Sequence, residues 1–130
     1  MNNNELYDII NDIKHSYSHE KLEVLIESLS HQQREDLYSL LFNFKSEVDD
    51  VIGQTYNKIK YLNKINEDDK NRILNDLDHQ PISRNLLESI NDYLQENYDD
   101  HTFEIALIHI QNVVESFCNR LVQYLERNWR

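Results

Sequence analysis

The scarcity of turn-forming residues constrains this chain most, because its 130 residues include one glycine, Gly53, and one proline, Pro81. β-Sheets need tight turns, which draw heavily on both residue types. Apolar residues instead recur at steps of three and four positions, the spacing that gathers side chains on one face of a helix. We therefore expect an all-α protein.

The apolar pattern divides the chain into about six helices. Two long helices, over residues 31–65 and 101–129, should form the frame of a single-domain bundle that spans residues 1–130. Shorter helices are expected near residues 6–17, 18–29, 66–77 and 83–98, with a loop around Pro81. No internal repeat is visible in the sequence.

Residues with side-chain oxygens mark where several helices should begin. Ser18, Asn66 and Ser83 are predicted N-caps, and Ser30 with Gln33 fits the S-x-x-Q capping box. Gly53 falls inside the first long helix, where it marks either a kink or a place where another helix packs closely. At the start of the last helix, Ile105 and Ile108 are apolar but lie off the apolar stripe. A helix that is apolar nearly all round is expected in a central position, covered on several sides.

The remaining composition favours a soluble cytoplasmic protein. The N-terminus has no basic segment of the kind that begins a secretory signal, and no apolar run approaches the roughly 20 residues of a membrane helix. The single cysteine, Cys118, is compatible with a reducing compartment and is expected to pack as a small apolar side chain. No motif indicates a cofactor.

Negative charge is concentrated in one part of the chain. Residues 76–115 contain nine acidic residues and one basic residue, Arg84, and so carry −8 of the formal charge of −11. Direct nucleic-acid binding normally requires a basic surface, which a chain with an isoelectric point near 4.8 lacks. Lys58, Lys60 and Lys64 are expected in the last turns of the first long helix, where cations complement the helix dipole.

Part of this charge forms a stripe on the helix expected at residues 83–98. Glu88, Asp92 and Glu96 recur every four positions opposite the apolar face, where like charges destabilise a helix slightly. Solvated acidic faces are also common in acidic proteins, but they usually interleave lysine or arginine. We therefore predict a partner-binding surface on the carboxylates and neighbouring tyrosines of this region: Asp76, Asp78, Glu88, Asp92, Tyr93, Glu96, Tyr98, Asp99 and Asp100.

A metal-dependent enzyme is an alternative hypothesis. Glu20-x-x-Glu23 and Glu47-x-x-Asp50 resemble the paired E-x-x-E and E-x-x-D motifs of all-α nucleotide pyrophosphohydrolases of the MazG type. The resemblance implies carboxylates that hold Mg²⁺ and position water on a phosphate. The four residues do not visibly converge on one helical face, so no metal site is predicted in the main interpretation.

In size, acidity and helical character the chain resembles bacterial immunity proteins, such as those of contact-dependent growth inhibition systems. That resemblance implies a non-enzymatic inhibitor whose acidic face covers the basic active site of a nuclease toxin. A phage-encoded nucleic-acid mimic, acting on a host DNA-binding enzyme, is a related alternative. A structural scaffold or homodimer is a third, and it would bury apolar rather than acidic surface.

Overall fold

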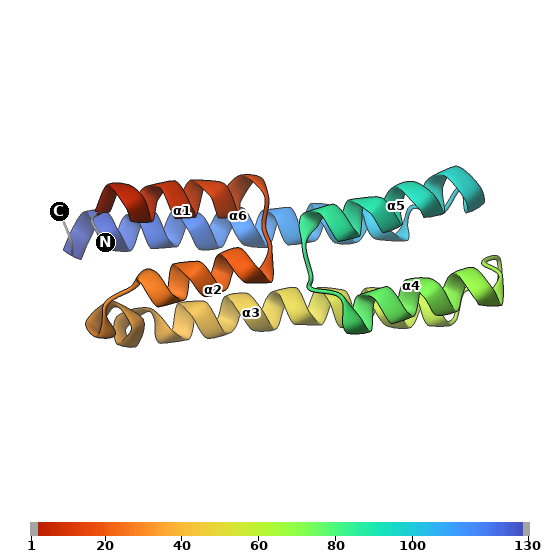
Figure 1. Ribbon diagram of the computed structural model, residues 1–130, viewed down its shortest axis with the longest axis horizontal. Coiled ribbons are helices and arrows are strands. Elements are labelled where there is room, and N and C mark those ends of the chain that lie inside the picture. Colours follow the sequence, from red (N-terminus) through yellow and green to blue (C-terminus); the bar gives the residue numbers. More distant parts are fainter. Residues whose placement is uncertain (1–2, 129–130) are drawn as a thin grey trace.

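The computed structural model describes residues 3–128, and within this range the chain is all-α, as predicted (Figure 1). The six helices are α1 (Asn3–His15), α2 (His19–Ser28), α3 (His31–Lys60), α4 (Glu67–His79), α5 (Arg84–Tyr98) and α6 (Thr102–Asn128). The predicted end of the last helix at residue 129 lies outside the described residues.

The long helices α3 and α6 run antiparallel along the whole molecule and form one layer. Phe44 of α3 and Phe117 of α6 stack with ring centroids 4.0 Å apart, and both are buried at the contact. The four short helices form a second layer, in which α1 and α5 pack on α6, α4 packs on α3, and α2 packs on α1 (Figure 1). Each end of the molecule is therefore a short four-helix bundle, and α3 and α6 are common to both ends.

Local capping explains where the helices begin. The Ser30 side chain accepts the N–H of Gln33, while the Gln33 side chain accepts the N–H of Ser30, which confirms the capping box. Ser18, Asn66 and Ser83 likewise accept N–H groups from the first turns of α2, α4 and α5. All four predicted caps are confirmed.

The end of α3 differs from the prediction. The helix stops at Lys60 rather than near residue 65, and Tyr61 is its C-cap. Ile65 is nevertheless buried, with 2% of its surface exposed, because the connection to α4 folds back over the core. The apolar spacing therefore extends past the last residue of α3, which is why the sequence predicts too long a helix.

The order of the helices repeats although the sequence does not. The series α1–α2–α3 has lengths of 13, 10 and 30 residues, and the series α4–α5–α6 has lengths of 13, 15 and 27. A half-turn of Figure 1 in its own plane brings α1 to the place of α4, α2 to α5 and α3 to α6. The fold thus has an approximate two-fold axis.

The two connections between short helices meet near that axis. His19 N–H donates to the Ile82 carbonyl at 3.1 Å, and Arg84 N–H donates to the Tyr17 carbonyl at 3.0 Å. These reciprocal bonds form an isolated antiparallel bridge between Ser18 and Ser83, the N-caps of α2 and α5. We call this central region, residues 16–19 and 80–84, the waist.

Two expectations about the long helices are wrong. A Cβ atom added at Gly53 would meet no atom within 4 Å, so no helix packs closely there, and α3 continues unbroken through this position. Ile105 and Ile108 are 65% and 58% exposed, so the first turns of α6 are not covered on all sides. α3 and α5 flank this part of α6, whereas α1 covers its other half.

Candidate functional site

The layer of short helices carries most of the negative charge. Helices α1, α2, α4 and α5 contain 14 acidic and five basic residues, a formal charge of −9. Helices α3 and α6, of similar total length, contain eight acidic and six basic residues, a charge of −2. The sequence window at residues 76–115 had missed the share of α1 and α2, which folding brings into the same layer. We call this layer the acidic layer.

Asp92 and Glu96 are the clearest free carboxylates of the predicted stripe. Both are exposed on α5, opposite its buried residues Leu87, Ile90 and Leu94. Neither makes a hydrogen bond or ion pair with any other residue in the range 3–128. Asp99, at the left-handed C-cap of the same helix, has a side chain that is 95% exposed and forms an ion pair with His101 at 3.2 Å. Uncompensated charge therefore lies along the outer face of α5.

Other carboxylates of the predicted surface have partners. Glu88 forms an ion pair with Arg84 at 2.7 Å, which neutralises much of its charge. Asp76 is half-buried and accepts a hydrogen bond from the Gln80 side chain at 3.0 Å. Asp78 is exposed and accepts one from the Tyr56 hydroxyl at 3.3 Å.

Tyr93 and Tyr98 connect two helices through their hydroxyls. Their hydroxyls donate to one carboxylate oxygen of Asp69, at 2.7 and 2.5 Å, and so join α5 to the first turn of α4. Arg72 lies over the Tyr93 ring at 4.4 Å and within 3.6 Å of Asp69. The hydrogen bonds from Tyr93 and Tyr98 hold the pKa of Asp69 below its ordinary value.

Asp100 is not part of the exposed surface. It is buried, with 4% of its surface exposed, and pairs with Lys64 at 3.1 Å. Its other oxygen accepts the N–H of Thr102, the first residue of α6, at 3.0 Å. Burial alone would raise the pKa of Asp100, but the hydrogen bonds from Thr102 and Lys64 outweigh it and lower that pKa. Lys64, predicted to complement a helix dipole, instead compensates this carboxylate.

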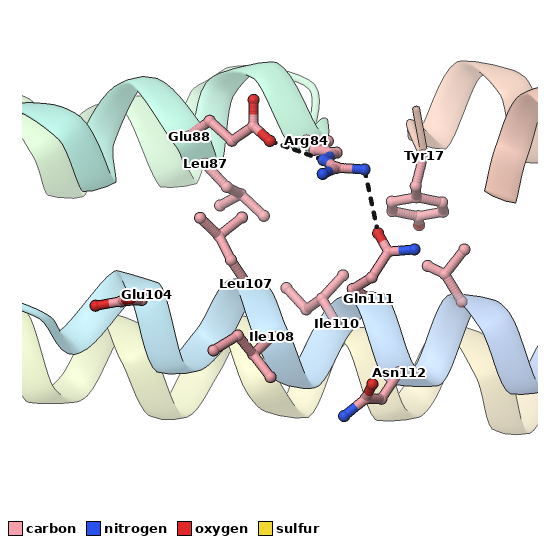
Figure 2. A pocket seen from close by; sticks show the side chains of 11 residues that line it. Tyr17, Arg84, Leu87, Glu88, Glu104, Leu107, Ile108, Ile110, Gln111 and Asn112 are labelled. Carbon is pink, nitrogen blue, oxygen red and sulfur yellow. Dashed lines mark hydrogen bonds and ion pairs between the residues drawn. The ribbon is translucent and has the colours of Figure 1, made fainter. Parts of the chain in front are cut away.

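A groove between α5 and α6 adjoins the carboxylate stripe, with a cavity of about 330 Å³ (Figure 2). Its apolar lining comes from Leu87 of α5 and Leu107, Ile110 and Val114 of α6. The half-exposed side chains of Glu88 and Glu104 flank it, and exposed Ile108 also lines it. We call this feature the α5–α6 groove.

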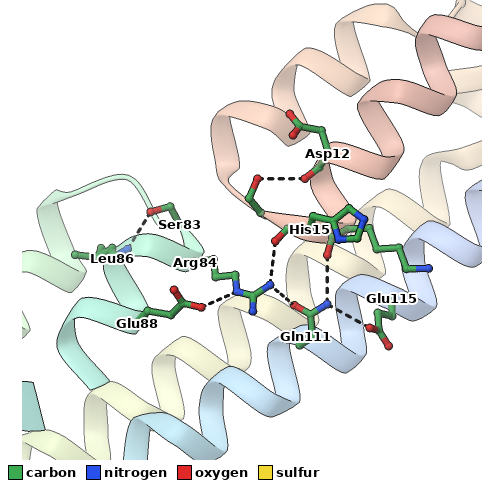
Figure 3. Close-up of polar contacts among 10 residues, drawn as sticks. Asp12, His15, Ser83, Arg84, Leu86, Glu88, Gln111 and Glu115 are labelled. Carbon is green, nitrogen blue, oxygen red and sulfur yellow. Dashed lines mark hydrogen bonds and ion pairs between the residues drawn. The ribbon is translucent and has the colours of Figure 1, made fainter. Parts of the chain in front are cut away.

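The waist closes one end of the groove with a polar network (Figure 3). Arg84 donates through Nη1 to the His15 carbonyl at 2.9 Å and to Gln111 Oε1 at 3.3 Å. Gln111 Nε2 in turn donates to the Lys14 carbonyl and to Glu115, both at 3.3 Å. The last carbonyls of α1 are therefore satisfied by side chains from α5 and α6.

Tyr17 lies at the same end and lines the groove (Figure 2). Its ring is 4% exposed and meets Phe44 edge-on, with centroids 5.5 Å apart. Burial, with a smaller effect from Asp49, raises the pKa of Tyr17 well above its ordinary value. The buried hydroxyl has no hydrogen-bond partner in the part of the chain that the structure describes.

The carboxylate pairs of the enzyme hypothesis do not form a site. Glu20 and Glu23 are exposed on α2, and Glu47 and Asp50 are exposed on α3. Within residues 3–128, no group of three or more histidine, cysteine or acidic side chains lies close enough together to hold a metal ion. Cys118 is buried as predicted, and burial raises its pKa to about 11.

The groove is the feature that the sequence did not reveal. Its lining comes from residues 17, 84–88 and 104–114. The packing of α5 on α6 joins the last two segments, and the waist adds Tyr17. The available signal in the sequence was Ile108, which is apolar but lies off the main stripe of α6. Apolar character alone predicts burial, whereas Ile108 is exposed.

Comparison with protein-family models, with curated proteins and with solved structures gave no significant match. None of the helices in residues 3–128 combines the length and apolar character needed to cross a membrane.

Proposed function

We propose that this protein is a non-enzymatic binding protein whose acidic layer docks on a basic protein. The observation that carries the proposal is the division of charge, −9 on the short helices against −2 on the long ones. When negative charge is concentrated on one side of a protein, its electrostatic field orients an approaching cationic partner, whereas evenly spread charge does not. Asp92 and Glu96 would contribute most, because they have no counter-charge among residues 3–128.

The partner that best fits this chemistry is a nuclease toxin, which would make the protein a cytoplasmic immunity protein. A nuclease binds phosphates and therefore has a basic cleft. An acidic inhibitor associates with such a cleft rapidly through electrostatic steering, and once bound it excludes the nucleic acid. Tyr93, Tyr98 and Asp100 are engaged in contacts within the fold, so the proposed contact surface on and beside α5 is reduced to Asp92, Glu96 and Asp99, with Glu88 at its edge.

Affinity capture tests this proposal. The tagged protein is immobilised, exposed to an extract of its native cell, washed with salt, and the released proteins are identified by mass spectrometry. We expect a basic protein that is released by raised salt and whose nuclease activity is abolished by an equimolar amount of this protein.

Three outcomes would change the assignment. A captured host DNA-binding enzyme without toxin activity would favour the nucleic-acid mimic. A basic nuclease that stays fully active in the complex would contradict the inhibitor function. Retention only of acidic or neutral proteins, unaffected by salt, would contradict docking through the acidic layer.

A further inference from the structure

The α5–α6 groove combines an apolar lining with an acidic surround. Leu87, Leu107 and Ile110 line it, and Glu88 and Glu104 flank it from opposite helices. Its volume, about 330 Å³, is near the lower end of the roughly 300–1,000 Å³ typical of ligand sites. A groove of this size suits one large side chain rather than an extended ligand.

The charges around the groove select against an anionic occupant. Arg84 is the one basic residue among the described residues that line the groove, and its guanidinium is already bonded to Glu88, Gln111 and the His15 carbonyl. Asp92 lies one helical turn beyond Glu88 and has no counter-charge within the described range. A cation next to the groove would therefore meet carboxylates on more than one side.

Exposed apolar surface extends from the groove toward solvent. Ile108 is 58% exposed and lines the groove, so a side chain that entered would cover it. Ile105, one turn earlier on α6, is 65% exposed but is not part of the lining. The two isoleucines are therefore similarly exposed, but Ile108 lines the groove and Ile105 does not.

We propose that the α5–α6 groove receives a single large apolar side chain of the basic partner, flanked in the partner's chain by lysine or arginine. The apolar side chain displaces water from Leu87, Leu107 and Ile108, while the flanking cations contact Glu88, Glu104 and Asp92. Interfaces commonly concentrate their affinity in one such buried anchor surrounded by polar contacts. This inference rests on the proposed function, because it assumes a basic protein partner.

The test uses a blocked peptide, Lys-Lys-Trp-Lys-Lys, titrated into the methyl-labelled full chain and followed by NMR. We expect shifts of the Leu87, Leu107 and Ile108 methyl signals. Replacing the peptide's tryptophan by glycine should weaken binding about tenfold or more, because the apolar contact is lost. Replacing its lysines by glutamates should abolish binding at low salt.

Two matched variants of the protein test whether the peptide's tryptophan binds in the α5–α6 groove. Ile108→Asn should weaken binding of the lysine–tryptophan peptide roughly five- to tenfold, because it removes apolar surface from the groove. Ile105→Asn makes the same change outside the groove and should leave binding within about twofold. Equal effects of the two variants would overturn the proposed position of the anchor.

The results with the different peptides distinguish failure of the groove proposal from failure of docking through the acidic layer. If the tryptophan and glycine peptides bind equally, and both shift signals near Asp92 and Glu96, the groove proposal fails while acidic docking stands. If the tryptophan peptide binds in the groove whatever the charge of its flanking residues, the basic character of the occupant is wrong. Absence of groove shifts at millimolar peptide would also overturn the inference.

Discussion

The unpartnered hydroxyl of Tyr17 allows a test at the scale of one residue. Tyr17→Phe removes a buried group with no hydrogen bond within the described residues, so the free energy of unfolding should stay the same or rise by up to about 1 kcal/mol. Tyr93→Phe is the matched control. It removes a hydrogen bond to Asp69 and should lower the midpoint of urea unfolding. A larger loss for Tyr17→Phe would show that its hydroxyl is in fact satisfied.

The ion pair of Asp100 leads to a second prediction for a single residue, which concerns how the free energy of unfolding depends on pH. At pH 7, Asp100→Asn should lower the free energy of unfolding by about 1–2 kcal/mol, because it removes a buried charge that Lys64 and Thr102 stabilise. The pKa of Asp100 is lowered in the folded state, so its contribution is complete above the ordinary carboxyl pKa of about 4. It is lost as the pH falls through the lowered value.

Urea unfolding at a series of pH values checks this prediction, with Asp99→Asn as the control at the adjacent, exposed position. The difference between wild type and Asp100→Asn should shrink below about pH 4. Asp99→Asn should stay within about 0.5 kcal/mol of wild type at pH 7. A difference for Asp100→Asn that grows toward acid pH would contradict the assigned charge pairing.

The residue scale is also where prediction from the sequence was weakest. Asp92 and Asp100 look alike in a charge count, but one is exposed and the other is buried against Lys64. The difference depends on the connection after α3, which folds back toward the start of α6. Local spacing contains no information about such contacts between distant segments. The tyrosine contacts with Asp69 were missed for the same reason.

At the scale of the helix, Gly53 gives the most direct prediction. It is exposed in an unbroken part of α3, and an added Cβ atom meets nothing. Gly53→Ala should therefore raise the free energy of unfolding by roughly 1 kcal/mol, since alanine loses less backbone entropy in a helix. The urea midpoint should rise without a change in the slope of the transition. A lower midpoint would indicate that α3 needs glycine at this position.

Helices were predicted well where their signals are local. The caps at Ser18, Ser30, Asn66 and Ser83 depend on bonds to residues three positions away, which the sequence contains directly. The predicted length of α3 was too great. Ile65 is buried, as its apolar character suggested, but it belongs to the connection that follows the helix. We also expected other helices to cover the start of α6 on several sides, but Ile105 and Ile108 are exposed there.

At the scale of the whole molecule, folding redistributes the charge that the sequence presents as one window. Residues 76–115 include parts of both layers, since Glu104 and Glu115 lie on α6. The three-dimensional division instead groups α1 and α2 with α4 and α5 across the approximate two-fold axis. The all-α class was accessible from periodicity alone, whereas this grouping required knowledge of how the helices pack.

The association rate of the captured basic partner with charge-reversed variants tests the central claim most directly. Asp92→Lys/Glu96→Lys reverses two carboxylates of the acidic layer. Glu47→Lys/Asp50→Lys makes the same change in net charge on α3. At low salt we expect the first pair to slow association about tenfold or more and to flatten its salt dependence, and the second pair to change the rate much less. Equal rates for the two variants would contradict docking through the acidic layer.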